Sequence, residues 1–210
     1  MTRDSLPWFF GPLLGAASCL MAQIPHEDSR NVNVPNTDTH FTMPHYSTVP
    51  DWEEHKKKLR AQILFAAGLT PMPQKTALHP VIFGRIEHND YSIEKVYIET
   101  LPGYYLSGNL YRPRGRTGKF PAVLSPHGHW DYGRLENQPL NSVPLRCINL
   151  AEQGFVVFSY DMVGYNDTLQ TPHDFGGPRE QLWGFGPLGL QLWNSIRALE
   201  APNANRICGF

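Results

Sequence analysis

The sequence predicts a protein of the α/β class, in which helices cover a sheet that contains parallel β-α-β units. Two short apolar runs, FPAVLSPHG (120–128) and GFVVFSYD (154–161), lack the polar alternation of strands that face water on one side. A helical pattern lies between them near 145–153, and a longer one follows at 188–200. Alternating strands and helices are typical of parallel β-α-β units with right-handed crossovers.

An antiparallel β-hairpin is expected before these units. The segments 91–99 and 104–112 are rich in aromatic and β-branched residues, and a Pro102-Gly103 turn separates them. The segment 81–86 has the same character and predicts one more strand. The sequence therefore predicts a hairpin followed by β-α-β units.

A helix is expected to begin sharply at Asp51, directly after a proline. Glu54 follows three residues later, in an aspartate version of the capping box. Trp52 and Ile63 fall on one apolar face, and Gly68 is a suitable stop.

The first 22 residues predict a secretory signal, and hence a secreted or periplasmic protein. Arg3 precedes an apolar stretch at 6–22, and cleavage is expected after Ala22. The alternatives are an apolar tail without structure and a misassigned start codon. Residues 23–50, which contain few apolar side chains, predict an extended lead-in.

The composition narrows the range of partners. A net charge of −1 offers no electrostatic footprint for nucleic acid, and no basic run suggests a membrane surface. Beyond the first 22 residues no stretch is long and apolar enough to span a bilayer. There is no C-x-x-C pair, so a thiolate zinc site is not expected. The oligomeric state stays open.

The stretch HGHWD allows two interpretations. His127, His129 and Asp131 are similar to the H-x-H-x-D metal signature of the metallo-β-lactamase fold, and His173 could add a ligand. Alternatively, the backbone around Gly128 approaches an oxyanion closely, and its N–H groups stabilise the negative charge. The first interpretation predicts a metal-dependent hydrolase, and the second an acyl-transfer enzyme without a metal or cofactor.

Four motifs favour the second interpretation. In order, GYYLSGNLYRP, PAVLSPHGHW, GFVVFSYDMVGYND and LWGFGPLGLQLWNSIRALE resemble secreted bacterial α/β-hydrolases of the acetyl xylan esterase or dienelactone hydrolase type, over roughly residues 50–200. The resemblance implies a serine carboxylesterase for acetyl or other small acyl esters, with carbohydrate esters as the expected substrates. It also implies that His127, Gly128 and His129 form the oxyanion loop, in which His129 supplies a backbone N–H.

The catalytic triad is expected beyond Phe210. The family's G-x-S-x-G motif follows a strand that resembles 206–210, and no G-x-S-x-G occurs in the sequence. We therefore expect residues 51–210 to be the N-terminal half of an α/β-hydrolase domain, truncated before the nucleophile and inactive alone. The remaining alternative is a non-catalytic binding module or an inert fragment.

Four further residues are candidates for shaping the pocket. Trp130 follows the oxyanion loop, and Asp161, Gly164 and Tyr165 follow the second parallel strand. Active-site loops gather at the carboxyl ends of such strands. The alternative for the later three is an Asx-type turn, in which Gly164 supplies an unusual backbone angle.

Overall fold

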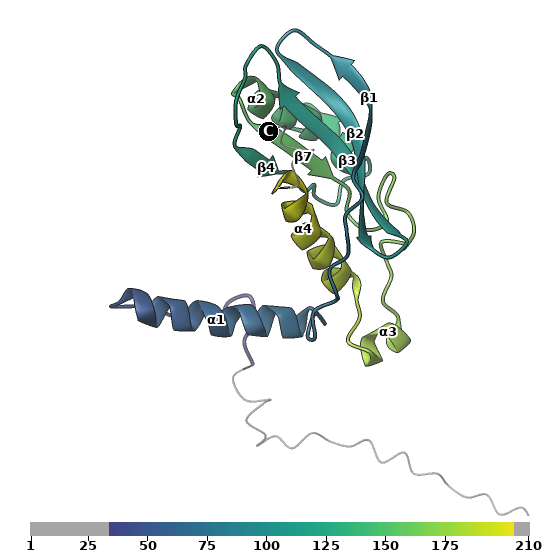
Figure 1. The fold of residues 1–210 in the computed structure, drawn as a ribbon. Helices are drawn as coiled ribbons and strands as arrows, with labels where there is room; N and C mark the ends of the chain where they lie inside the picture. The colour runs from purple at the N-terminus through teal and green to yellow at the C-terminus, as the bar shows by residue number, and fades with distance from the viewer. Residues whose placement is uncertain (1–33, 204–210) are drawn as a thin grey trace, which may run out of the picture. The chain divides into compact units, whose positions relative to one another are not determined.

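The computed structural model describes residues 34–203 (Figure 1). The chain divides into two units, Met1–Tyr46 and Ser47–Phe210, and the second contains all the helices and strands described below. The predicted signal at 1–22 and the predicted strand at 206–210 lie outside the described residues.

Helix α1 (Val49–Ala66) begins two residues earlier than predicted. Its N-cap is Thr48, so the predicted Asp51–Glu54 capping pair is wrong by one turn. The Thr48 hydroxyl accepts the Asp51 N–H at 3.3 Å and donates to the Asp51 carboxylate at 2.7 Å. The helix ends just before Gly68, as predicted, where φ is +69°. No side chain of α1 is buried.

Three strands form the predicted antiparallel part of the sheet. β1 (Val81–Glu87) pairs with β2 (Tyr91–Leu101), and β2 pairs with β3 (Tyr104–Pro113). The Pro102-Gly103 turn joins β2 to β3 as expected.

The parallel part of the sheet is a β-α-β unit. β4 (Ala122–Leu124) leads through α2 (Val143–Glu152) to β7 (Val156–Tyr160), and the strand order is β1-β2-β3-β7-β4. β7 is buried throughout, as predicted. β4 is shorter than predicted and exposed at Ala122, because it lies at the edge of the sheet formed by the described residues.

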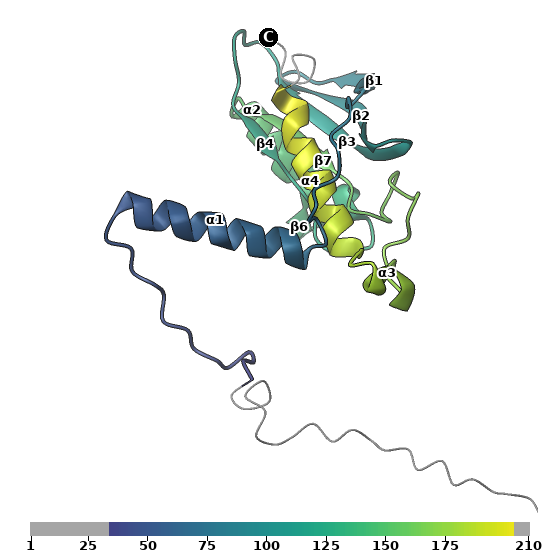
Figure 2. The same cartoon turned by 60° about the horizontal axis from the view of Figure 1, so that its bottom comes forward.

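Helices cover both faces of this sheet (Figures 1 and 2). Phe158 packs in one core cluster with Ala198 of α4 (Pro187–Asn203), whereas Val157 packs in another with Cys147 of α2. Neighbouring residues of a strand face opposite sides, so the two helices lie on opposite faces. This arrangement confirms the predicted α/β class.

Four short elements were not predicted: η1 (Gly133–Leu135), β5 (Asn137–Gln138), β6 (Asn141–Ser142) and α3 (Pro178–Leu182). Each has five residues or fewer, too few to show a hydrophobic period. Within the described part of the chain, no helix has the length and apolar character needed to cross a membrane.

The parallel pair determines where a site can form. Leu124 pairs with Phe158, so the loops that follow β4 and β7 leave the sheet at the same edge. The first loop contains the HGHWD stretch, and the second contains Asp161 and Tyr165.

Candidate active site

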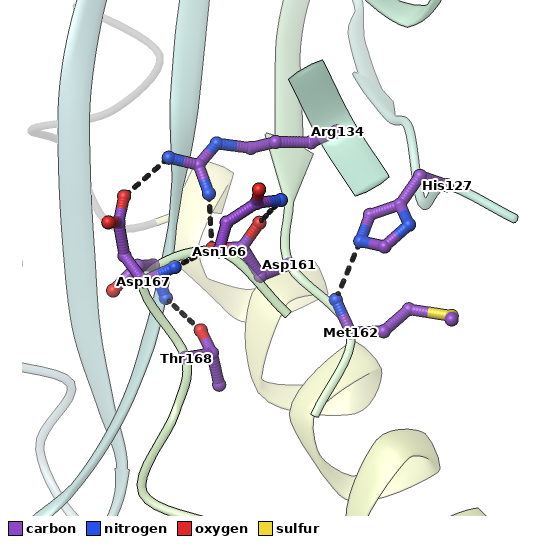
Figure 3. Close-up of polar contacts among 8 residues, drawn as sticks. His127, Arg134, Asp161, Met162, Asn166, Asp167 and Thr168 are labelled. Atoms are coloured by element: carbon purple, nitrogen blue, oxygen red, sulfur yellow. Dashed lines mark hydrogen bonds and ion pairs between the residues drawn. The ribbon is translucent and has the colours of Figure 1, made fainter. Parts of the chain in front are cut away.

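His127 lies buried after β4, and both of its ring nitrogens are engaged. Its Nε2 accepts the Met162 backbone N–H at 3.0 Å, so this nitrogen carries no proton. Nδ1 is therefore the protonated nitrogen, and it donates to the Gly128 carbonyl at 2.7 Å. The imidazole thus connects the loop after β4 to the loop after β7 (Figure 3).

The Gly128 carbonyl accepts a second hydrogen bond, from the Trp130 N–H at 2.9 Å. The Gly128–His129 peptide is trans, so the His129 N–H points away from the Gly128 carbonyl oxygen, which already accepts two hydrogen bonds. Within residues 34–203 the His129 N–H donates to no acceptor. The loop therefore holds one backbone donor in a fixed orientation and leaves it available.

Burial lowers the pKa of His127 below its usual value, while the Gly128 carbonyl and the Asp161 carboxylate oppose the shift. A neutral ring is required here, because protonated Nε2 could not accept the Met162 N–H. His127 is therefore suited to orienting the backbone and not to carrying a charge.

The loop after β7 is held by a buried ion pair (Figure 3). Arg134 in η1 contacts the Asp161 carboxylate and also donates to Asp167 at 2.6 Å. Asp161 is fully buried, and its carboxylate accepts hydrogen bonds from the Asn166 side chain at 2.9 Å and the Asp167 N–H at 3.1 Å. These contacts fix the geometry of both loops relative to each other.

Burial raises the pKa of the Asp161 carboxyl, and the Arg134 guanidinium opposes that shift. The carboxylate is surrounded by donors from its own loop and from Arg134. Asp161 therefore positions the loop and is not available as a proton acceptor for a substrate.

Tyr165 brings the second loop against the first, and Gly164 lies against His173 within the second loop. Gly164 has φ +80°, and a Cβ there would lie 2.2 Å from the His173 backbone nitrogen. The Tyr165 ring lies 5.0 Å from the His127 ring and 4.8 Å from that of His173, both edge-on. His129 and His173 are also in edge contact, with ring centroids 4.9 Å apart.

A cavity of about 240 Å3 opens beside this ring cluster. Its lining residues come from both loops and from the start of α4: His129, Met162, Val163, His173, Pro187, Leu188 and Gln191. A larger hollow of about 840 Å3 lies along β5, β6 and α2, but none of the predicted site residues lines it. The smaller cavity is therefore the candidate pocket.

Trp130 and Asp131 of the HGHWD stretch do not line the candidate pocket. Trp130 packs beside the core cluster that contains Tyr111 and Cys147, and it does not line the cavity. Asp131 is exposed to solvent.

The metal interpretation finds no support in this geometry. Both ring nitrogens of His127 are already engaged, Nδ1 with the Gly128 carbonyl and Nε2 with the Met162 N–H. Among the described residues, no three His, Cys, Asp or Glu side chains are grouped to hold a metal ion.

Sequence reasoning missed Arg134, Asn166 and Gln191, and it considered His173 as a further metal ligand. Gln191 has one weak signal, because it is a polar residue within the apolar stretch LGLQLW. Arg134 and Asn166 have no such signal in the sequence. The partner of Arg134 is 27 residues away, and Asn166 belongs to an irregular loop.

No family model and no curated protein matches the sequence. Among solved structures, the chain is similar to Methylesterase BT1017, with 23% identity, a TM-score of 0.61 and coverage of 78% of this chain and 35% of that one. It is also similar to a candidate acetyl xylan esterase from Bacteroides fragilis NCTC 9343, with 17% identity, a TM-score of 0.57 and coverage of 76% and 46%.

At these identities the likeness shows the fold. The chain has an α/β fold of the kind found in these two structures and spans less than half of the length of each.

Proposed function

We propose that the chain is the oxyanion-binding part of a serine esterase of the α/β-hydrolase type. The observation that carries this proposal is the fixed Gly128–His129 peptide, whose N–H is available at the carboxyl end of a parallel strand. A backbone donor held in advance stabilises the negative charge of a tetrahedral intermediate, and loss of one such donor costs about 2.7–4 kcal/mol.

The remaining machinery is proposed to lie beyond Phe210. A serine there would attack the ester carbonyl, a histidine would transfer the proton, and an acid would orient that histidine. Acetylated carbohydrate is the proposed substrate class, in line with the motif resemblance and with the name of one of the two similar structures, a candidate acetyl xylan esterase; the other is named a methylesterase.

The first test compares the native protein with the 210-residue chain. We expect the native protein to exceed 23.8 kDa and to react with a fluorophosphonate probe, whereas the isolated chain does not react. A native mass at or below 23.8 kDa without labelling would instead favour a binding role. Ester hydrolysis that is lost with a chelator, without any labelling, would favour the metal alternative.

The second test addresses the loop in the native-length protein. His127→Ala should lower kcat for a chromogenic acetate about 100-fold or more with KM nearly unchanged, because the oxyanion donor loses its fixed orientation. Asp131→Ala is the matched control, since this exposed neighbour should leave kcat unchanged. Equal effects of the two substitutions would contradict the proposed role of the loop.

Export is also part of the proposal. The mature protein is expected to begin at Gln23, after removal of residues 1–22, and N-terminal sequencing of protein from the culture medium or periplasm would check this. An intact Met1 in cytoplasmic protein would overturn it.

A further inference from the structure

The cavity beside His129 contains two hydrogen-bonding groups that one backbone residue orients. The Val163 N–H donates to Gln191 Oε1 at 2.8 Å, and the Val163 carbonyl accepts from His173 Nδ1 at 2.8 Å. Both residues line the cavity, as Val163 itself does. Their orientations are therefore determined by the protein before any ligand binds.

These contacts define what each side chain still offers. Gln191 Oε1 already accepts the Val163 N–H, so the side-chain NH2 is the group left to donate to a ligand. Within the described residues this NH2 has no hydrogen-bond partner. His173 donates through Nδ1, so Nε2 is the ring nitrogen left for a ligand, and without a proton it is an acceptor. The cavity thus has one oriented donor and one oriented acceptor.

The lining excludes two classes of ligand. None of the lining residues is Lys, Arg, Asp or Glu, so a cationic ligand would find no counter-ion, and an anionic ligand would find one only in a protonated His129 or His173. A hydrocarbon chain would displace water from the Gln191 side-chain NH2 and offer no acceptor in its place. Burying this donor without a hydrogen bond would cost binding free energy. A neutral ligand with hydroxyl groups satisfies both polar groups, and its carbon atoms can contact Met162 and Leu188.

We propose that this cavity is a subsite for a neutral sugar ring, recognised through its hydroxyl groups by Gln191 and His173. About 240 Å3 equals the volume of about eight water molecules, a space of the order of one small sugar ring. This proposal rests on the proposed function, because the cavity is a substrate subsite only in an esterase. In that case the carbohydrate part of the ester binds in this cavity.

Methionine methyl NMR on the native-length protein tests the subsite directly. The sequence has five methionines, of which Met162 lines the cavity, while Met72 does not line it and serves as a reference. We expect methyl β-xyloside to shift the Met162 signal to saturation at millimolar concentration. Tetrahydropyran, the same ring without hydroxyl groups, should bind at least about tenfold more weakly.

Two tryptophan substitutions provide a matched pair. Leu188→Trp enlarges a cavity-lining side chain and should abolish the xyloside shift, whereas Leu182→Trp on α3 should leave it unchanged. Gln191→Met should weaken binding about tenfold. No xyloside shift, or an equal response to tetrahydropyran, would overturn the subsite.

Sugar binding and ester hydrolysis, measured on the same protein, distinguish the sugar subsite from the proposed esterase function. Sugar binding by a native protein that hydrolyses no ester would support the subsite and refute the esterase. Ester hydrolysis without sugar binding at Met162 would refute the subsite alone.

Discussion

Arg134 and Asp161 form a buried ion pair between residues that follow two different strands. Arg134 is 5% exposed and Asp161 is 0% exposed, and the pair connects η1 to the loop after β7. His127 makes a second connection between the same loops through the Met162 N–H. The candidate site is therefore held by two cross-links that are independent of any ligand.

Loss of Arg134 should destabilise the protein strongly. Arg134→Met leaves the Asp161 charge buried without its cation, and we expect the free energy of unfolding to fall by about 3–5 kcal/mol. Urea denaturation measures this change. The double variant with Asp161→Asn should recover part of the loss, and Arg179→Met on the exposed surface of α3 should change stability by less than about 0.5 kcal/mol.

His127 should make stability depend on pH. Its pKa is lowered in the folded protein, so the unfolded chain binds a proton first as the pH falls. The contribution is complete above the unfolded pKa of about 6.5 and is lost progressively below it. Melting temperatures between pH 8 and pH 5 should fall more steeply for the wild-type protein than for His127→Gln. Parallel curves for the two proteins would contradict this assignment.

Gly164 should tolerate no side chain. Gly164→Ala combines positive φ with a Cβ 2.2 Å from the His173 nitrogen, and we expect a loss of at least about 2 kcal/mol. Gly103→Ala is the matched control, because it has φ +71° but no atom within 4 Å of the new Cβ. Only the backbone cost of about 1 kcal/mol should appear there. Equal losses, measured by urea denaturation, would show that the close approach to His173 is unimportant.

Cys147 should react only when the protein opens. It is fully buried in the α2 core cluster, and burial raises the pKa of its thiol. In a chain with Cys19→Ser and Cys208→Ser, we expect iodoacetamide at pH 8 to label Cys147 in urea and to leave the folded protein unlabelled for hours. Rapid labelling of the folded chain would show that α2 is not packed as described.

The sequence alone determined the α/β class and most of the regular elements. The apolar run at 154–161, the Pro102-Gly103 turn and the helical period at 188–200 are local signals that appeared as predicted, whereas the apolar run at 120–128 formed only the three-residue strand β4. The position of His127, Gly128 and His129 after a parallel strand followed from the same local pattern. The start of α1 was wrong because Thr48 and Asp51 both suit an N-cap, and the sequence pattern does not decide between them.

The contacts that hold the site together follow from the folded arrangement of the chain and not from local sequence. Arg134 reaches Asp161, His127 reaches Met162 and Val163 orients Gln191 across 27 to 35 residues of sequence. No periodicity encodes such pairs, because they exist only after β4 and β7 lie side by side and their loops leave the sheet at one edge. The chemistry of the loop could be read locally, whereas its geometry depends on contacts between distant parts of the chain.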